Sequence, residues 1–87
     1  MAKYKLFFKA SVAKDLRAIP KKDVTRILQR IDALQDQPRP AGCEKLSGEE
    51  RFRVRQGNYR IVYEIEDLYL IVTVIRVGHR RQVYLPR

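Results

Sequence analysis

The sequence has no tryptophan, and it contains only one cysteine and one histidine among its 87 residues. The single cysteine, Cys43, cannot form a disulfide within the chain, so we interpret it as a reduced thiol. No stretch approaches the ~20 apolar residues that a membrane-spanning helix requires, and the segment Met1–Lys5 precedes no apolar signal core. We therefore expect a cytoplasmic protein that does not enter a membrane.

Clusters that could bind a metal are absent as well. Histidine, cysteine and carboxylate residues nowhere recur at the spacing of metal ligands. The acidic residues Glu64, Glu66 and Asp67 stand together where a turn is expected, and we interpret them as the solvated tip of a hairpin. The sequence thus predicts neither a metal nor another cofactor.

Nucleophilic side chains are few, and most have a structural explanation. Ser11 is expected to cap a helix and Ser47 to form a turn, while Cys43 has no histidine near it in sequence. The groups left for proton transfer are His79, Tyr84 and the arginines. Histidine is the residue type best suited to proton transfer at neutral pH, although in a basic loop it also serves as a phosphate contact.

Acidic residues are in deficit overall. Nineteen lysines and arginines stand against ten acidic residues, which gives a formal net charge of +9 and indicates a polyanion as partner. The segment from Arg51 to Arg87 holds eight arginines, no lysine and three acidic residues. Because the planar guanidinium group fits phosphate oxygens and stacks on bases, this bias favours nucleic acid.

The N-terminal half of the chain is expected to form a strand and two helices, within one domain that spans residues 1–87. Aromatic residues over Tyr4–Phe8 predict the strand. Ser11 is expected to cap a helix over residues 12–18, which Pro20 ends. A longer amphipathic helix follows, because apolar residues recur at helical spacing; they are Val24, Ile27, Leu28, Ile31 and Leu34.

The C-terminal half alternates as strands do. In residues 51–55 three arginines alternate with two apolar residues, which places the arginines on one face of a strand. A Gly-Asn pair predicts a tight turn into a returning strand, Tyr59–Glu66. A third strand, Tyr69–Val77, is apolar on both faces and is expected inside the sheet, with Gly78 as its end. Gln82–Leu85 could add an edge strand.

These elements predict an α+β fold in which an N-terminal strand and a helical hairpin pack on one face of a small, mainly antiparallel β-sheet. The opposite face then carries the arginines. The two-residue turn fixes the register of the hairpin, so Arg53, Arg55 and Arg60 are expected close together. Whether the segment His79–Arg81 joins them depends on strand order. Four aromatic rings are expected in the core: Phe7, Phe8, Phe52 and Tyr63.

Four short motifs follow one another in a characteristic order. They are Lys45–Gly48, Arg51–Arg55, Gly57–Tyr63 and Val77–Tyr84. This order resembles the RelE branch of the RelE/ParE toxin superfamily over nearly the whole chain, and it implies a RelE-like fold. The hairpin motif Gly57–Tyr63 is shared widely across that superfamily. The terminal motif, Gly-His-Arg followed two residues later by Val-Tyr, is typical of its ribonuclease branch.

The resemblance implies a toxin of a type II toxin–antitoxin system, a ribosome-dependent endoribonuclease that cleaves mRNA by 2′-hydroxyl attack without a metal. Arg53 and Arg55 match positions where RelE toxins place basic residues at the scissile phosphate and the 2′-hydroxyl. Arg60 would bind the phosphate and stabilise the transition state. Arg80 would act on the leaving 5′-oxygen, as charge stabiliser or acid, and Tyr84 would stack on a base.

The implied partners are an acidic antitoxin, the ribosome and its mRNA, and operator DNA for the toxin–antitoxin complex. Arg51 and Arg81 are expected to bind RNA. One position departs from the family pattern, because the best-known RelE toxins have lysine where this chain has Arg55, and arginine is a poorer base. Either Arg55 only orients and polarises the hydroxyl, or His79 takes the proton.

Two other functions remain compatible with this fold and charge. A ParE-like poison of DNA gyrase has the same fold and catalyses nothing, so fold alone does not separate the two. A plain nucleic-acid-binding protein would account for the charge but predicts basic residues spread along one surface. The sequence cluster of His79, Arg80 and Tyr84 favours the ribonuclease.

Overall fold

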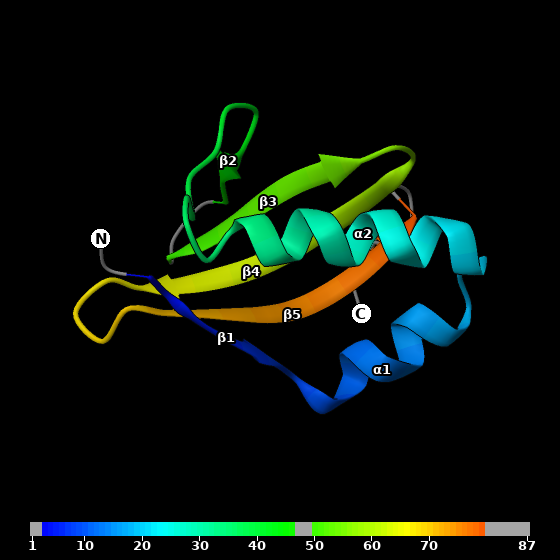
Figure 1. Ribbon diagram of the computed structural model, residues 1–87, viewed down its shortest axis with the longest axis horizontal. Coiled ribbons are helices and arrows are strands. Elements are labelled where there is room, and N and C mark those ends of the chain that lie inside the picture. The colour runs from blue at the N-terminus through cyan, green and yellow to red at the C-terminus, as the bar shows by residue number, and fades with distance from the viewer. Residues whose placement is uncertain (1–2, 47–49, 80–87) are drawn as a thin grey trace.

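A computed structural model describes residues 3–46 and 50–79 of the chain (Figure 1). It contains two helices and five strands, in the order β1 (Lys5–Phe8), α1 (Ala10–Arg17), α2 (Lys21–Ala33), β2 (Glu44–Lys45), β3 (Arg51–Gln56), β4 (Tyr59–Glu66) and β5 (Ile71–His79). The strands form one sheet in the order β1-β5-β4-β3-β2, in which β1 runs parallel to β5 and the other pairs are antiparallel. The expected α+β fold is confirmed.

The helices lie on one side of the sheet, and the core lies between the two layers. α2 crosses the strands β3 to β5, while α1 packs beside β5 (Figure 1). Apolar residues at helical spacing on α2 meet the alternate residues of the strands, as the sequence pattern predicts. The fully buried residues include Ile27, Ile31, Ile61, Tyr63, Val72 and Val74. No helix within residues 3–46 and 50–79 is long and apolar enough to cross a membrane.

Tyr63 ties this core to the loop that follows α2. Its ring is fully buried and stacks against Phe52 with 6.0 Å between the ring centroids. Its hydroxyl donates a hydrogen bond of 2.6 Å to the carbonyl oxygen of Pro38. Burial raises the pKa of Tyr63, so the hydroxyl keeps its proton and remains a donor.

A β-bulge in β5 changes which residues of that strand face the helices. Val62 of β4 pairs with Arg76, but the next residue, Tyr63, pairs with Val74, so Ile75 is an extra residue. Strict alternation from Val74 would turn the Arg76 side chain into the core. The bulge instead turns it to the opposite face and leaves Val77 buried, at 3 % exposure.

The backbone of β5 beyond the bulge is held by α1. β1 pairs with β5 only as far as Val74, so the next stretch of β5 has no strand on that side. There the N–H of Val77 donates to the carboxylate of Asp15 on α1, over 3.1 Å. This contact satisfies a backbone donor that would otherwise lack a strand partner, and it fixes α1 against the sheet.

The expected boundaries of α1 and β5 were wrong, and β5 begins at Ile71 rather than at Tyr69. Ser11 is not the N-cap: α1 begins at Ala10 with Lys9 at its N-cap. The reason is that Lys9 donates its N–H to Val74 and accepts from Val12, so β1 leads directly into the helix. Gly78 does not end β5, because β4 extends far enough to pair with both Gly78 and His79.

Two of the four aromatic rings expected in the core lie at the surface. Phe52 and Tyr63 are buried as predicted, at 5 % and 0 % exposure, but Phe7 and Phe8 are 50 % and 45 % exposed. β1 is an edge strand that pairs only with β5: Phe7, opposite Thr73, lies on the sheet face without helices, and Phe8, on the helix side, is only partly covered. The expected turn at Ser47 and the expected edge strand at 82–85 lie outside the described residues.

Glu66 and Asp67 are exposed at the β4–β5 turn, as expected for a solvated tip, and Asp67 also binds two side chains there. Asp67 accepts hydrogen bonds from the Tyr4 hydroxyl (2.6 Å) and from both terminal nitrogens of Arg39 (2.8 and 3.1 Å). The Arg39 guanidinium also lies 5.1 Å from the ring centroid of Phe52. This cluster connects the start of the chain, the loop after α2 and the β4–β5 turn.

The Asp67 cluster predicts a specific loss of stability in acid. Hydrogen bonds from Arg39 and Tyr4 lower the pKa of Asp67 from 3.8 to about 2. A carboxylate with a depressed folded-state pKa stabilises the fold above its unfolded pKa, and this contribution disappears as the pH falls through the folded value. Asp67→Asn should therefore lower the Tm at pH 7, and the difference from wild type should shrink toward zero near pH 2. Thermal unfolding followed by circular dichroism measures it; a difference that does not change with pH would contradict this role.

Candidate functional site

The face of the sheet turned away from the helices carries a set of arginines, which we call the arginine face. Arg51, Arg53 and Arg55 alternate along β3, Arg60 lies on β4, and Arg76 lies on β5 after the bulge. The register pairs Arg55 with Arg60 directly across the hairpin. The expected grouping of Arg53, Arg55 and Arg60 is therefore present in the structure.

Within the described residues, Arg60 is the charged residue that is buried, and only 4 % of its surface is exposed. It lies on the central strand, between Arg55 on β3 and Gly78 on β5. A guanidinium group stays protonated even when it is buried. Arg60 therefore holds a positive charge at a fixed place of low dielectric, where its attraction for an anion is stronger than at an exposed site.

Two neighbouring arginines are held by carboxylates. Arg53 forms an ion pair with Glu44 of β2, and the Nε of Arg51 donates to Glu64 of β4 over 2.9 Å. The Arg53 side chain is only 13 % exposed, and burial together with the charge of Arg55 lowers the pKa of Arg53. These contacts limit how the guanidinium groups move, so the positive charge of the face is ordered before any ligand binds.

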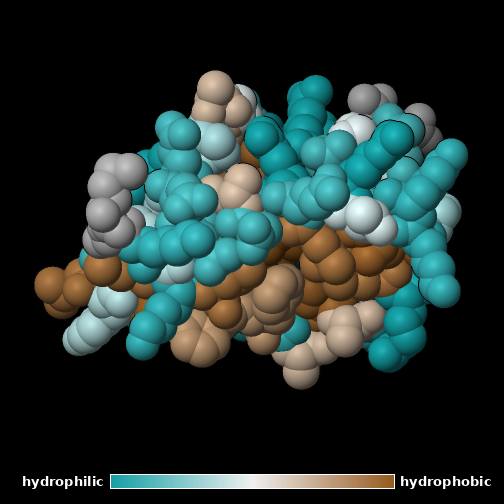
Figure 2. Space-filling view, in the orientation of Figure 1, coloured by the Kyte–Doolittle hydropathy of each residue, from teal (hydrophilic) through white to brown (hydrophobic). Residues whose placement is uncertain are grey.

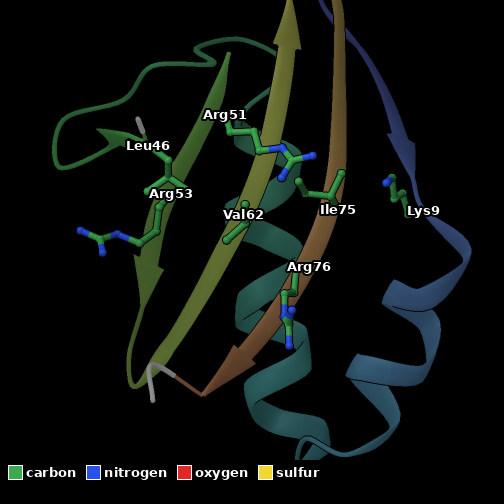
Figure 3. Close-up of a pocket in the computed structure, with 7 residues that line it drawn as sticks. All are labelled: Lys9, Leu46, Arg51, Arg53, Val62, Ile75 and Arg76. Carbon is green, nitrogen blue, oxygen red and sulfur yellow. The ribbon is translucent and has the colours of Figure 1, made fainter. Parts of the chain in front are cut away.

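A groove of about 340 Å³ crosses the arginine face (Figure 3). Its basic side chains come from the β1–α1 junction, β3 and β5, and its apolar ones come from β4, β5 and the residue after β2. Figure 3 shows Arg51 reaching across β4 toward β5, while Lys9 points toward β5 from the opposite side. The lining residues are Lys9, Leu46, Arg51, Arg53, Val62, Ile75 and Arg76.

His79 lies on the other face of the sheet, with the helices. It pairs with Tyr59, and the two rings contact edge to face with centroids 6.1 Å apart. Hollows beside His79 are lined by residues of α1 and α2. This placement does not support the idea that His79 takes the base role of Arg55, because the sheet separates its ring from Arg55. Arg80, Arg81 and Tyr84 lie outside the described residues.

Lys9 and Arg76 belong to the arginine face although the sequence patterns did not single them out. Lys9 comes from the junction of β1 and α1, far in sequence from the arginine-rich half. The sequence did offer an indication for Arg76, because a charged residue within an apolar interior strand has to point away from the core. Strict alternation would have placed it beside Val72 and Val74, which are both fully buried.

The chemistry available on this face is the binding of phosphate groups. Cationic side chains outnumber the carboxylates, and the two carboxylates near them, Glu44 and Glu64, are engaged by arginines. No group of three or more metal-ligating residues occurs in the described part of the chain. Fixed guanidinium groups bind phosphate oxygens in two-point geometry and stabilise charge that develops on them.

Comparison with known proteins shows to which family the chain belongs. The sequence model described as the ParE toxin of type II toxin–antitoxin systems matches residues 6–84. The chain belongs to this family. It is thus a toxin of the RelE/ParE superfamily from a type II system, as the motifs suggested.

Individual relatives in this family are RelE-type toxins. The chain is 28 % identical to toxin RelG of Mycobacterium tuberculosis over 85 residues, which cover 93 % of this chain and 95 % of RelG. It is similar to the M. tuberculosis RelBE2 toxin–antitoxin complex (TM-score 0.81, 28 % identity, 92 % and 94 % coverage). It is also similar to the RelE–RelB complex of Pyrococcus horikoshii (TM-score 0.80, 27 % identity, 92 % and 97 % coverage). These matches agree with the RelE-like fold.

The side of this toxin fold that carries the helices has an exposed apolar band. Figure 2 shows hydrophobic residues below α2, between that helix and the elements β1 and α1. A groove of about 390 Å³ lies there, lined by Phe8, Lys9, Ala10, Val12, Ala13, Leu16 and Leu28. Phe8 and Leu28 are 45 % and 40 % exposed, so large apolar side chains contact solvent in this band. Contiguous apolar surface is typical of sites that bind another protein, a membrane or a ligand.

Proposed function

We propose that this toxin is a ribosome-dependent endoribonuclease that cleaves mRNA by attack of the 2′-hydroxyl and thereby stops translation. The observation that carries the proposal is the buried guanidinium of Arg60, centred on an ordered arginine face. The resemblance to the RelE branch and the similarity to RelE-type toxins support the same activity. A buried guanidinium that is ordered before the ligand binds suits the stabilisation of charge in a transition state.

In the proposed reaction the 2′-oxygen bonds to the adjacent phosphorus while the bond to the 5′-oxygen breaks. Water takes the proton of the 2′-hydroxyl and returns one to the leaving 5′-oxygen, so the products are a 2′,3′-cyclic phosphate and a 5′-hydroxyl. Arg60 binds the non-bridging oxygens and stabilises the charge of the transition state. Arg53 binds the scissile phosphate, and Arg55 orients and polarises the 2′-hydroxyl. We assign Arg80 to the leaving 5′-oxygen, whose charge it stabilises.

The remaining site residues bind the rest of the RNA. Tyr84 is assigned to stacking on an unstacked base, and Arg51 and Arg81 to the backbone phosphates. This chemistry does not depend on a bound metal. Because arginine is a weak base, the protein relies on the ribosome to align the 2′-hydroxyl with the phosphorus, an effect that can contribute several kcal/mol. We therefore expect slow cleavage of free RNA.

The ends of cleaved messages test this function. Brief induction in bacteria should halt protein synthesis and produce mRNA fragments with 5′-hydroxyl and 2′,3′-cyclic phosphate ends, because the 2′-oxygen is the nucleophile. DNA should remain intact. Mapping of 5′-hydroxyl ends, together with a reporter of DNA damage, measures both outcomes. A damage response without new 5′-hydroxyl ends would exclude the ribonuclease and indicate a gyrase poison.

We further propose that an acidic antitoxin inhibits the toxin by covering the arginine face and the apolar band. The net charge of +9 attracts an acidic chain. The similar proteins of M. tuberculosis and P. horikoshii were solved as complexes with their antitoxins. An apolar segment of the partner would bury Phe8 and Leu28, while its acidic residues would compete with RNA for the arginines.

A charge placed in the apolar band should separate inhibition from cleavage. Leu28→Glu should weaken binding of the acidic antitoxin by roughly tenfold or more, because a carboxylate would be buried in the complex. Ribosome-dependent cleavage should stay within about twofold, since Leu28 lies on the other face. Leu68→Glu is the matched control, because Leu68 is 85 % exposed at the β4–β5 turn. Titration calorimetry measures the affinities; equal effects of the two variants would contradict this contact.

A further inference from the structure

Two basic side chains of the groove on the arginine face have no role in the proposed cleavage. Lys9 and Arg76 both line it, together with Arg51 and Arg53. Arg51 and Arg53 bind Glu64 and Glu44. Among the described residues, neither Lys9 nor Arg76 makes a side-chain hydrogen bond or ion pair. Their charges are therefore available to an anionic ligand.

The backbone that carries these two cations is fixed. The N–H of Lys9 donates to Val74 over 2.9 Å, and its carbonyl oxygen accepts from Val12 over 3.0 Å, so Lys9 is held at both sides. Arg76 follows the bulge and pairs with Val62. The next residue, Val77, is tied to α1 by the hydrogen bond to Asp15. The separation of the two side chains thus depends on sheet geometry rather than on a loop.

The floor of the groove between these cations is apolar. Val62 is 7 % exposed, and Ile75 lies beside it as the extra residue of the bulge. Figure 3 shows Ile75 between Lys9 and the guanidinium of Arg51. A site that combines cationic side chains at its ends with an apolar floor fits a ligand that has both an anionic and a flat apolar part. A nucleotide has this composition, and about 340 Å³ lies within the ~300–1,000 Å³ of typical ligand sites.

The groove is continuous with the residues assigned to cleavage. Arg60 pairs with Gly78, and Val62 pairs with Arg76, so the two pairs are two residues apart along β4. That separation is about 6.6 Å along a strand. A nucleotide adjacent to the cleaved one could reach the groove without a break in the path of the RNA backbone.

We propose that this groove binds one nucleotide of single-stranded RNA next to the cleavage position. Lys9 and Arg76 contact its phosphate, and Val62 and Ile75 contact the face of its base. The proposal rests on the proposed ribonuclease function and adds a substrate subsite to it. The subsite binds by phosphate and apolar contact, so it tolerates different bases.

The test measures binding separately from cleavage. The probe is a short fluorescein-labelled single-stranded RNA with 2′-fluoro riboses, which cannot be cut by 2′-hydroxyl attack. Fluorescence anisotropy at several KCl concentrations gives the affinity and its salt dependence. Lys9→Gln with Arg76→Gln should lower the affinity roughly tenfold. It should also reduce the slope of log K against log salt by about 0.7 for each phosphate contact that is lost.

A matched control variant has the same net charge as the Lys9 and Arg76 variant. Arg17→Gln with Lys22→Gln removes one arginine and one lysine that are exposed on α1 and α2. This control should leave the salt slope within error of wild type. Ile75→Ala should lower the affinity by roughly three- to tenfold without changing the slope, because it removes apolar contact and no charge. Circular dichroism verifies that each variant is folded.

The outcomes distinguish the subsite from the proposed function. If the Lys9 and Arg76 variant binds RNA with wild-type affinity and slope, or if the control loses as much as it does, the subsite is wrong even when ribosomal cleavage is observed. If the variant loses affinity only for the acidic antitoxin, the groove binds protein and the proposal is also wrong. If the variant loses RNA affinity as expected but the wild-type toxin does not cleave mRNA on ribosomes, the proposed function is wrong while RNA binding in the groove is supported.

Discussion

The burial of Arg60 is the constraint on which the functional face depends. A guanidinium group at 4 % exposure must be compensated by hydrogen bonds and by its surroundings, because an uncompensated buried charge would cost several kcal/mol. The hairpin provides these surroundings by placing Arg60 on the central strand of the sheet. The helices cover the opposite face and bury the apolar residues, so none of the described helices lies over the arginine face (Figure 1).

The bulge in β5 is the second feature that builds this face. It allows one strand to supply Val74 and Val77 to the core and Arg76 to the opposite side. Beyond the bulge, the hydrogen bond from Val77 to Asp15 gives a backbone donor its partner and also anchors α1. Because α1 begins at the end of β1, the same anchor stabilises the segment that carries Lys9. Core packing and the position of the groove cations are thus coupled through one short stretch of backbone.

Periodic features of the chain were predictable from sequence. The apolar spacing of α2 and the alternation of β3 are properties of regular helices and strands, so they give correct faces for Ile27, Ile31 and the three arginines of β3. The Gly-Asn turn fixed the hairpin register and hence the pairing of Arg55 with Arg60. The fold class followed from these elements.

Features that depend on tertiary pairing were not predictable. Alternation gives the face of Arg60 but not its depth, which depends on the strands that flank β4. The bulge turns Arg76 to the face opposite the one that strict alternation would give, and no local sequence pattern shows where the bulge lies. Phe7 and Phe8 have core-like composition, but an edge strand leaves them exposed. His79 was expected in a loop after Gly78, whereas pairing with Tyr59 keeps it in the strand and on the helix side.

The most direct test of this account is the rate at which ribosomes programmed with a defined mRNA are cleaved by Arg60 variants. Arg60→Ala should lower the single-turnover rate by ~10²–10³, the usual loss for one preorganised charge contact, and Arg60→Lys should recover part of it. Arg26→Ala, an exposed arginine of α2, should cleave at nearly the wild-type rate. Thermal unfolding shows whether each variant is folded. A folded Arg60→Ala variant that cleaves mRNA as fast as Arg26→Ala would contradict the account.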